Sequence, residues 1–250
     1  MRNKLLLSTA AMVLAGLLVP ALVQAQTGAG IVVFRHTTDL DVSRATDFDG
    51  TDDTFDQGLK AWDMRGSGIG FRVAHQFPKL ASIHAVAGLA QVTLRDEDIT
   101  DPNLGLNSRG FDDDVYFSAG ARIGDAIPSN PNVFWSLGAD FNLFSSDFNE
   151  DVTTKWNYDE TSFSFDGSLG YMVQGVGFYG GARVVSYSAD LEEIDSTRIP
   201  GQQTRLIEME RDGQFDLMFG ARTNTMPVMG FVEVGLVGSF SATTGFSFRF

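Results

Sequence analysis

Apolar and polar side chains alternate with a period of two through most of the chain after residue 25. The alternation is clearest in segments 133–143, 162–173 and 214–224, where one face is apolar or aromatic and the other is polar. Successive side chains of a β-strand point to opposite faces, so this period indicates strands with two unlike faces. Helical patterns are scarce, and no later apolar run approaches the roughly 20 residues of a spanning helix. The sequence therefore predicts an all-β fold.

The first 25 residues have a different character. Arg2 and Lys4 precede an apolar stretch, and Val23 and Ala25 place small residues at positions −3 and −1 of a cut before Gln26. This layout is typical of a secretory signal peptide that is removed from the mature protein. We predict a signal peptide over 1–25 and a mature domain over 26–250, the alternative being an uncleaved membrane anchor. The chain has no cysteine, so a lipoprotein anchor is excluded.

The orientation of the two faces decides between a soluble sandwich and a membrane barrel. The polar faces are rich in Gly and Ser with isolated Asp and Arg, unlike a solvated Lys/Glu/Thr face. The connections also alternate between short turns and long polar segments, as they do in transmembrane barrels, whose strands are apolar outside and polar inside. The short turns fall near 78–80, 126–132, 174–176 and 226–229, and the long segments near 39–59, 95–114, 147–160 and 190–212.

The C-terminus carries the most specific motif. The last eight residues read TTGFSFRF, in which Thr243, Gly245, Phe248 and Phe250 follow the pattern polar-x-Gly-x-x-aromatic-x-aromatic. Here the chain resembles bacterial outer-membrane β-barrel proteins, in particular the small barrels of the OmpA-like transmembrane, OmpW and opacity type. The resemblance implies an outer-membrane location, lipid and lipopolysaccharide as surroundings, and recognition of this segment by the barrel assembly machinery.

The number of strands follows from the run lengths. The last run, 229–250, is too long for one crossing of about 9–11 residues. A hairpin at Val237-Gly238-Ser239 divides it and gives an up-and-down antiparallel barrel of ten strands; the alternative is eight. The parity of the apolar residues also slips across 66–70, for which we predict a Gly-rich bulge. The predicted runs are 28–38, 60–77, 81–94, 114–125, 132–146, 160–173, 177–189, 213–225 and 229–250.

Charged residues recur on the predicted inner face. The triplet Gly-Ala-Arg occurs at 120–122, 181–183 and 220–222, with Gly and Arg on the same face. Because inner charges require partners or water, we predict a network of arginines and carboxylates in a largely filled interior, the alternative being an open aqueous channel. The predicted network comprises Arg122, Asp140, Asp166, Arg183, Asp216, Arg222 and Glu233.

The net charge of −14 is concentrated in the four long segments, which hold 26 acidic and seven basic residues, a net charge of −19. A chain this acidic is a poor nucleic-acid ligand, because phosphate binding needs clustered Lys and Arg. The acidic segments are predicted to lie outside the cell, either as a solvated surface or with divalent cations bridging to lipopolysaccharide. Oxygen ligands suited to calcium are dense at Asp47, Asp49, Asp52 and Asp53, although their spacing is not that of an EF-hand.

Enzyme signatures are weak. The only histidines are His36, His75 and His84. Lipid A deacylase barrels carry His-x-Ser-Asn, whereas His36 is followed by Thr37-Thr38-Asp39. The stretch 66–70 is no phosphate loop, because no helix pattern follows it. We therefore expect a structural, surface-exposed barrel without cofactor or catalysis; the alternatives are a narrow porin-like channel for small solutes and a lipid-modifying enzyme.

Overall fold

The computed structural model describes residues 26–46, 61–77, 81–96, 109–110, 114–149, 152–199, 201–202, 204–223 and 228–250. The predicted signal peptide and the candidate calcium ligands Asp47, Asp49, Asp52 and Asp53 lie outside these residues. No helix in the described part of the chain is long and apolar enough to cross a membrane.

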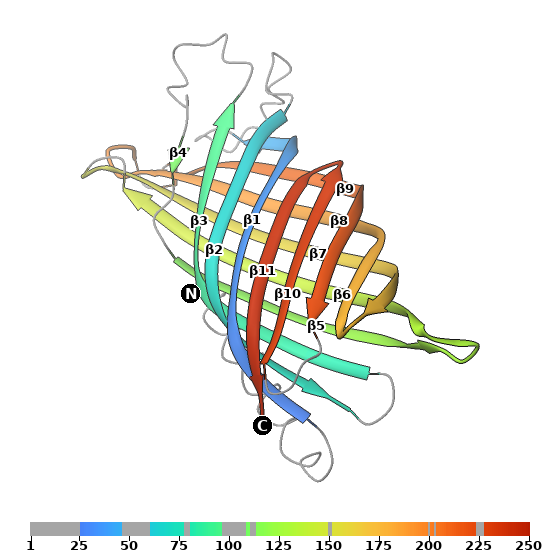
Figure 1. Ribbon diagram of the computed structural model, residues 1–250. Helices are drawn as coiled ribbons and strands as arrows, with labels where there is room; N and C mark the ends of the chain where they lie inside the picture. Colours follow the sequence, from blue (N-terminus) through green and yellow to red (C-terminus); the bar gives the residue numbers. More distant parts are fainter. Residues whose placement is uncertain are drawn as a thin grey trace.

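The fold is an antiparallel sheet of eleven strands, ten of which close into a ring (Figure 1). Each ring strand pairs with its neighbour in sequence, β2 pairs with β3, and β1 closes the ring against β11; the two-residue β4 pairs only with β3. The ten-stranded up-and-down barrel is therefore confirmed. The strands are β1 (Gln26–Thr46), β2 (Ala61–Gln76), β3 (Ala81–Asp96), β4 (Arg109–Gly110), β5 (Asp114–Ile127), β6 (Asn130–Asn149), β7 (Thr154–Val173), β8 (Val176–Asp195), β9 (Thr204–Thr223), β10 (Val228–Val237) and β11 (Phe240–Arg249).

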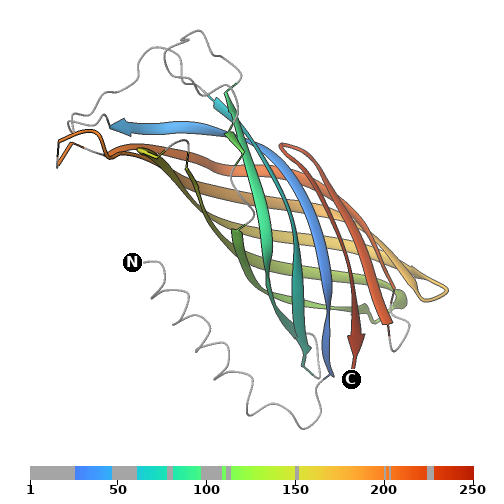
Figure 2. The same ribbon diagram turned by 90° about the vertical axis from the view of Figure 1, so that its left-hand side faces the viewer.

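The last two strands form a short hairpin at the predicted position. β10 and β11 have 10 residues each, whereas β1 has 21 and β9 has 20. Beyond the hairpin tip β1 pairs directly with β9, from Asp41 opposite Glu210 onward. Figure 2 shows β1 and β9 continuing side by side past the hairpin. The hairpin strands are thus full members of the ring at one end of the barrel and absent from the other.

Several strands extend further than predicted at the end where the long segments lie. β1 runs to Thr46 rather than 38, β7 begins at Thr154 rather than 160, and β9 begins at Thr204 rather than 213. Parts of the predicted loops are therefore paired strands. The reason is that inward-facing residues of these extensions are apolar and pack together inside the barrel.

The apolar face of the strands changes sides part-way along the barrel. In β2, Ile69 and Phe71 point outward and are 52% and 57% exposed, whereas Trp62 and Met64 point inward and are 1% and 0% exposed. The pairing of β2 with β1 and β3 runs without a shift from residue 62 to 76. The predicted bulge at 66–70 is therefore wrong: the strand is regular, and it is the apolar face that moves from the outside to the inside.

In β9 the same change of faces is made by a bulge. The register between β8 and β9 shifts between Val185 and Tyr187, where β9 contains one additional residue, and Gly213 there has a φ of +64°. One extra residue reverses which parity points inward. Met209 is consequently buried inside the barrel, while Phe215, six residues later, points outward and is 49% exposed.

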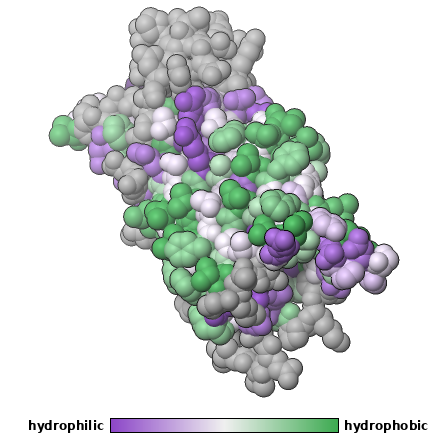
Figure 3. Space-filling model, in the orientation of Figure 1, coloured by the Kyte–Doolittle hydropathy of each residue, from purple (hydrophilic) through white to green (hydrophobic). Residues whose placement is uncertain are grey.

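The outward apolar residues form a band around the barrel wall. The band lies between the short turns and the level at which the apolar face moves to the inside. Figure 3 shows hydrophobic residues across the middle of the visible wall and hydrophilic residues toward its ends. Both termini of the barrel lie at the short-turn end, where the backbone N–H of Phe250 donates to the carbonyl oxygen of Thr27 (3.0 Å). A closed antiparallel ring with an outward apolar band and both ends at the short turns is the architecture of an outer-membrane barrel, whose short turns face the periplasm.

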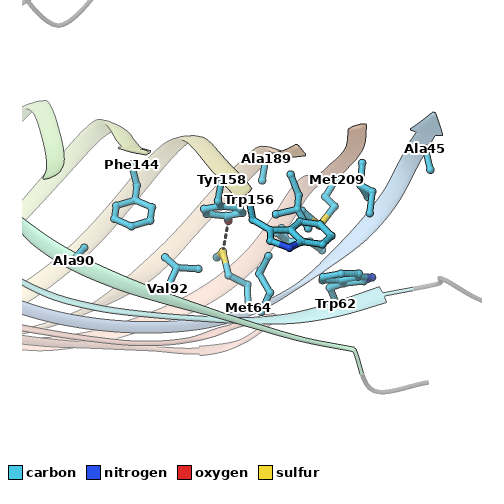
Figure 4. Close-up of a cluster of buried hydrophobic side chains, with 14 residues drawn as sticks. Ala45, Trp62, Met64, Ala90, Val92, Phe144, Trp156, Tyr158, Ala189 and Met209 are labelled. Atoms are coloured by element: carbon cyan, nitrogen blue, oxygen red, sulfur yellow. Dashed lines mark hydrogen bonds between the residues drawn. The ribbon is translucent and has the colours of Figure 1, made fainter. Parts of the chain in front are cut away.

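The apolar side chains that point inward seal the other half of the barrel. Fourteen residues form this apolar cluster (Figure 4), in which the hydroxyl of Tyr158 lies 3.0 Å from the sulfur of Met64. Seven strands contribute (β1, β2, β3, β6, β7, β8 and β9), so the cluster crosses the full width of the interior. Its members are Leu40, Ala45, Trp62, Met64, Ala90, Val92, Leu94, Phe144, Trp156, Tyr158, Ala189, Leu191, Ile207 and Met209.

A matched pair of substitutions tests the two environments of the wall. Leu191→Ala removes a buried side chain from the apolar cluster and is expected to lower the free energy of unfolding by about 2–5 kcal/mol. Leu169→Ala removes an outward side chain that is 61% exposed, and lipid contact at one leucine is worth less than about 1 kcal/mol. Urea unfolding of both variants in lipid vesicles measures the difference. Equal losses of unfolding free energy in the two variants would contradict the assignment of Leu191 to the interior and Leu169 to the lipid-facing surface.

Candidate functional site: the interior of the barrel

On the short-turn side of the apolar cluster, the interior contains a cavity of about 570 Å³. Its lining begins at strand ends on the short-turn side, at Gln26, Gln76 and Arg249, and reaches His36 and Glu160 beneath the cluster. The hydroxyl of Tyr158 in the cluster donates to Oε2 of Glu160 (3.0 Å), which marks the boundary between the two regions. The interior is thus an apolar seal over a polar, charged cavity.

Two of the three arginines predicted for the interior meet predicted carboxylates. Arg122 donates from Nη2 to Oδ1 of Asp166 (2.8 Å), and Arg183 pairs with Glu233, which also accepts from the hydroxyl of Tyr179 (2.9 Å). Gly138 lies beside the first pair, and a Cβ there would come within 2.6 Å of Asp166 Oδ1. The absence of a side chain at Gly138 therefore leaves the space in which the Arg122 guanidinium meets the Asp166 carboxylate.

Asp140 and Asp216 have other partners. Asp140 lies 2.9 Å from Nε2 of His84. Asp216, buried on β9, accepts the backbone N–H (2.9 Å) and the hydroxyl (2.8 Å) of Ser239 at the tip of the β10–β11 hairpin. Val237 in that tip has a φ of +108°, which a β-branched residue rarely adopts. Asp216 therefore holds a strained turn in place rather than neutralising an arginine.

Arg222 and a residue that the sequence analysis did not select, Arg72, rest on aromatic rings. The guanidinium of Arg222 lies 4.2 Å from the ring centroid of Phe134, and that of Arg72 lies 5.2 Å from the centroid of Phe231. Both arginines line the cavity, and within the described residues neither is paired with a carboxylate. The sequence does contain a signal for Arg72, because in a regular strand it lies on the same inner face as Gly70 and Ala74. The bulge predicted at 66–70 leaves the inner face of β2 undefined, so this signal is lost.

His36 was also overlooked as an interior residue. Its ring stacks at 6.3 Å from Phe34 and 6.4 Å from Tyr187, and its Nε2 atom is buried without a hydrogen-bond partner in the described residues. Gly66 lies against the ring, where a Cβ would approach Cε1 to 2.2 Å. The glycines of β2 therefore make room for a neighbouring ring instead of forming a bulge.

Three residues of the predicted assembly signal, Thr243, Gly245 and Phe248, lie on β11, and Phe250 directly follows it; β11 pairs with β1 from Arg249 to Phe240. Phe248 and Phe250 point outward at the short-turn end and are 51% and 80% exposed. Thr243 lines the cavity, and a Cβ on Gly245 would come within 2.7 Å of the ring of Phe231. The aromatic residues thus contribute to the lower edge of the apolar band; their recognition by the assembly machinery stays a prediction.

Carboxylates on the strand extensions form a row on the outer surface. Asp159 on β7 is the register partner of Asp190 on β8, which is the partner of Glu208 on β9; we call these three residues the acidic ladder. Glu160, predicted to lie in an acidic loop, instead points inward from β7 and is buried. In the part of the chain that the structure describes, no group of three or more His, Asp or Glu residues is arranged to hold a metal ion.

The sequence matches no protein-family model and no curated protein. Among solved structures, the fold is similar to OprG from Pseudomonas aeruginosa, with 13% identity over 88% of this chain and 96% of that chain and a TM-score of 0.41. The outer-membrane protease OmpT from Escherichia coli matches with 10% identity over 90% and 94% of the two chains and a TM-score of 0.43. An outer-membrane channel from Pseudomonas putida F1 matches with 10% identity over 92% and 97% and a TM-score of 0.36.

The Arg122–Asp166 pair makes a quantitative prediction. Asp166 is buried, whereas Arg122 faces the cavity, so Arg122→Ala leaves an uncompensated buried carboxylate and should cost about 3–5 kcal/mol. Asp166→Ala should cost less, because the arginine that remains is hydrated. The double variant should be less destabilised than the two single losses combined.

Arg222→Ala is the control for this cycle, since it removes only an aromatic contact, worth about 0.5–1 kcal/mol. Urea unfolding supplies all four values. Additive losses at Arg122 and Asp166 would show that the two side chains act independently and line water.

Proposed function

We propose that this protein is a structural barrel of the outer membrane that is closed to solutes and displays acidic strand ends and loops outside the cell. The observation that carries this proposal is the apolar cluster. Leu40, Met64, Tyr158 and Met209 are fully buried within it, at 0% exposure. A close-packed and mainly apolar section across the interior offers a passing solute little water and few hydrogen-bonding groups.

The cell-surface role is supported by the charge on the strand extensions. The acidic ladder lies on the outer surface beyond the apolar band, a position that supports contact with lipopolysaccharide head groups. Like charges directly opposite each other on a sheet are unfavourable, so a row of three reflects a requirement other than stability. Surrounding lipid and lipopolysaccharide, with divalent cations between carboxylates and phosphates, are the partners that we propose.

Two other functions compete with this one. A narrow channel requires a continuous path, and the apolar cluster interrupts it. A lipid-modifying enzyme requires a reactive group at the membrane edge, whereas the His84–Asp140 pair faces the cavity inside the barrel. We therefore propose that the protein is not an enzyme.

Single-channel recording in planar bilayers tests the closed barrel. The purified protein should show no conductance steps, because the cluster excludes water. Tyr158→Ala combined with Met209→Ala empties the centre of the cluster and should produce steps. Phe163→Ala combined with Phe165→Ala, on the lipid side, should remain silent. Regular steps in the wild-type protein would replace the structural proposal by the channel.

The acidic ladder makes a pH-dependent prediction. Burial and the carboxylates of Glu208, Asp159 and Glu210 raise the pKa of Asp190, which lies beyond the apolar band. A raised pKa means that ionisation disfavours the folded state, so the cost is absent at pH 3 and complete at pH 8. Asp190→Asn should raise the free energy of unfolding at pH 8 by about 0.2–0.5 kcal/mol and leave it unchanged at pH 3.

Asp147→Asn is the matched control, because Asp147 is paired with Lys155 (2.7 Å) and its removal should not stabilise the protein. Urea titrations at the two pH values compare the variants. A loss of stability in Asp190→Asn at pH 8 would show that the ladder carboxylates do not repel each other.

A further inference from the structure

The charges that line the cavity are unbalanced toward its periplasmic end. Arg122 and Arg183 are neutralised by Asp166 and Glu233, and Asp140 lies beside His84. Three inward arginines remain. Arg249 donates to the amide oxygens of Gln26 (2.6 Å) and Gln76 (2.8 Å), while Arg72 and Arg222 contact aromatic rings.

Arg72 on β2 and Arg222 on β9 line the same cavity, and Phe231 lies next to both. Arg222 on β9 is the register partner of Phe231 on β10, so the two side chains are neighbours on the inner wall. Arg72 reaches from β2 to the ring of Phe231. Stacking against a ring fixes a planar guanidinium, and its N–H groups remain available along its edge. Phe231 therefore lies beside both cations: its ring carries the guanidinium of Arg72, and its register partner Arg222 places its own guanidinium on Phe134.

We propose that Arg72 and Arg222 form a binding site for an anionic group, a phosphate or a carboxylate, in the periplasmic half of the cavity. The guanidinium fork matches both groups in geometry and charge. A cation inside a membrane barrel requires a partner or water, and among the described residues neither arginine forms an ion pair with a carboxylate, since Asp166 and Glu233 are paired with Arg122 and Arg183. The ligand enters from the periplasm, since the lining of the cavity begins at Gln26 and Arg249 at the strand ends.

The proposed site also adjoins the lipid-facing surface of the barrel. An apolar groove of about 500 Å³ on the outer surface shares Arg222, Thr223, Gly230 and Phe231 with the cavity. Strand pairing between β9 and β10 begins only at Phe231, and below it the hydroxyl of Thr223 accepts the N–H of Gly230 (2.8 Å). The anionic group therefore belongs either to a soluble periplasmic solute or to a lipid whose chain lies in this groove.

Titration calorimetry at low ionic strength tests the site on the full mature barrel in a non-ionic detergent. The probes are inorganic phosphate and dodecyl phosphate. At least one should bind saturably, and Arg72→Gln and Arg222→Gln should each weaken it about tenfold or more. Arg198→Gln, at the opposite end and paired with Asp195, is the control and should bind as the wild type does. The shift in gel mobility on heating confirms that each variant is folded.

The two sources of the anion are separated by Gly230→Leu. A Cβ at Gly230 would have no atom closer than 3.7 Å, and Gly230 lines the groove, so a leucine at this position is expected to occupy it. A lipid ligand predicts tighter binding of dodecyl phosphate than of phosphate, lost in Gly230→Leu. A soluble ligand predicts phosphate binding that this variant leaves unchanged. Absence of saturable binding by both probes, or equal binding by an Arg72→Gln/Arg222→Gln double variant, would overturn the site.

Discussion

The structure depends on the requirement that apolar side chains of the strands face lipid in one section of the barrel and one another in the next. The bilayer solvates apolar groups, so in the band around Ile69 and Phe71 they point outward and the interior is polar. Beyond the band the wall meets water, so Trp62 and Met64 on the same strand point inward. The strand itself remains regular, and only the distribution of residue types changes.

The two halves of the interior follow from this requirement. Where the inward side chains are apolar they pack across the barrel and seal it without any inserted loop or helix in the described residues. Where they are polar they must satisfy each other, and Arg122 and Arg183 each do so with a carboxylate from the next strand but one, β7 and β10 respectively. The short β10–β11 hairpin belongs to the lower half alone, and Asp216 fixes its tip at the level where the interior changes character.

Much of this architecture could be predicted from the sequence because a period of two has a direct structural meaning. The strands, the hairpin near Val237 and the inward parity of Arg122, Arg183 and Glu233 follow from it. The extensions of β1, β7 and β9 do not follow from it, because a segment rich in acidic residues predicts a loop, whereas here many of these residues form the outer face of paired strands. The parity slip at 66–70 predicts a bulge only if the lipid-facing side is constant along the strand, and in β2 the apolar face changes sides instead.

Contacts between side chains of non-adjacent strands could not be predicted from the sequence. Alternation identifies the face on which a side chain lies, but not which strand lies opposite it. Neither the contact of His84 with Asp140 nor the approach of Arg72 to Phe231 has a signal in sequence spacing, because each depends on the curvature and closure of the sheet.

The inversion of faces is tested most directly by spin labels on single cysteines along β2, since the chain has no cysteine of its own. Accessibility to oxygen reports lipid, and accessibility to a nickel chelate reports water. A label at Phe71 should be accessible to oxygen, one at Arg65 to nickel, and one at Met64 to neither. Oxygen accessibility at Met64 equal to that at Phe71 would show that the apolar face stays outside along the whole strand, and would contradict the account.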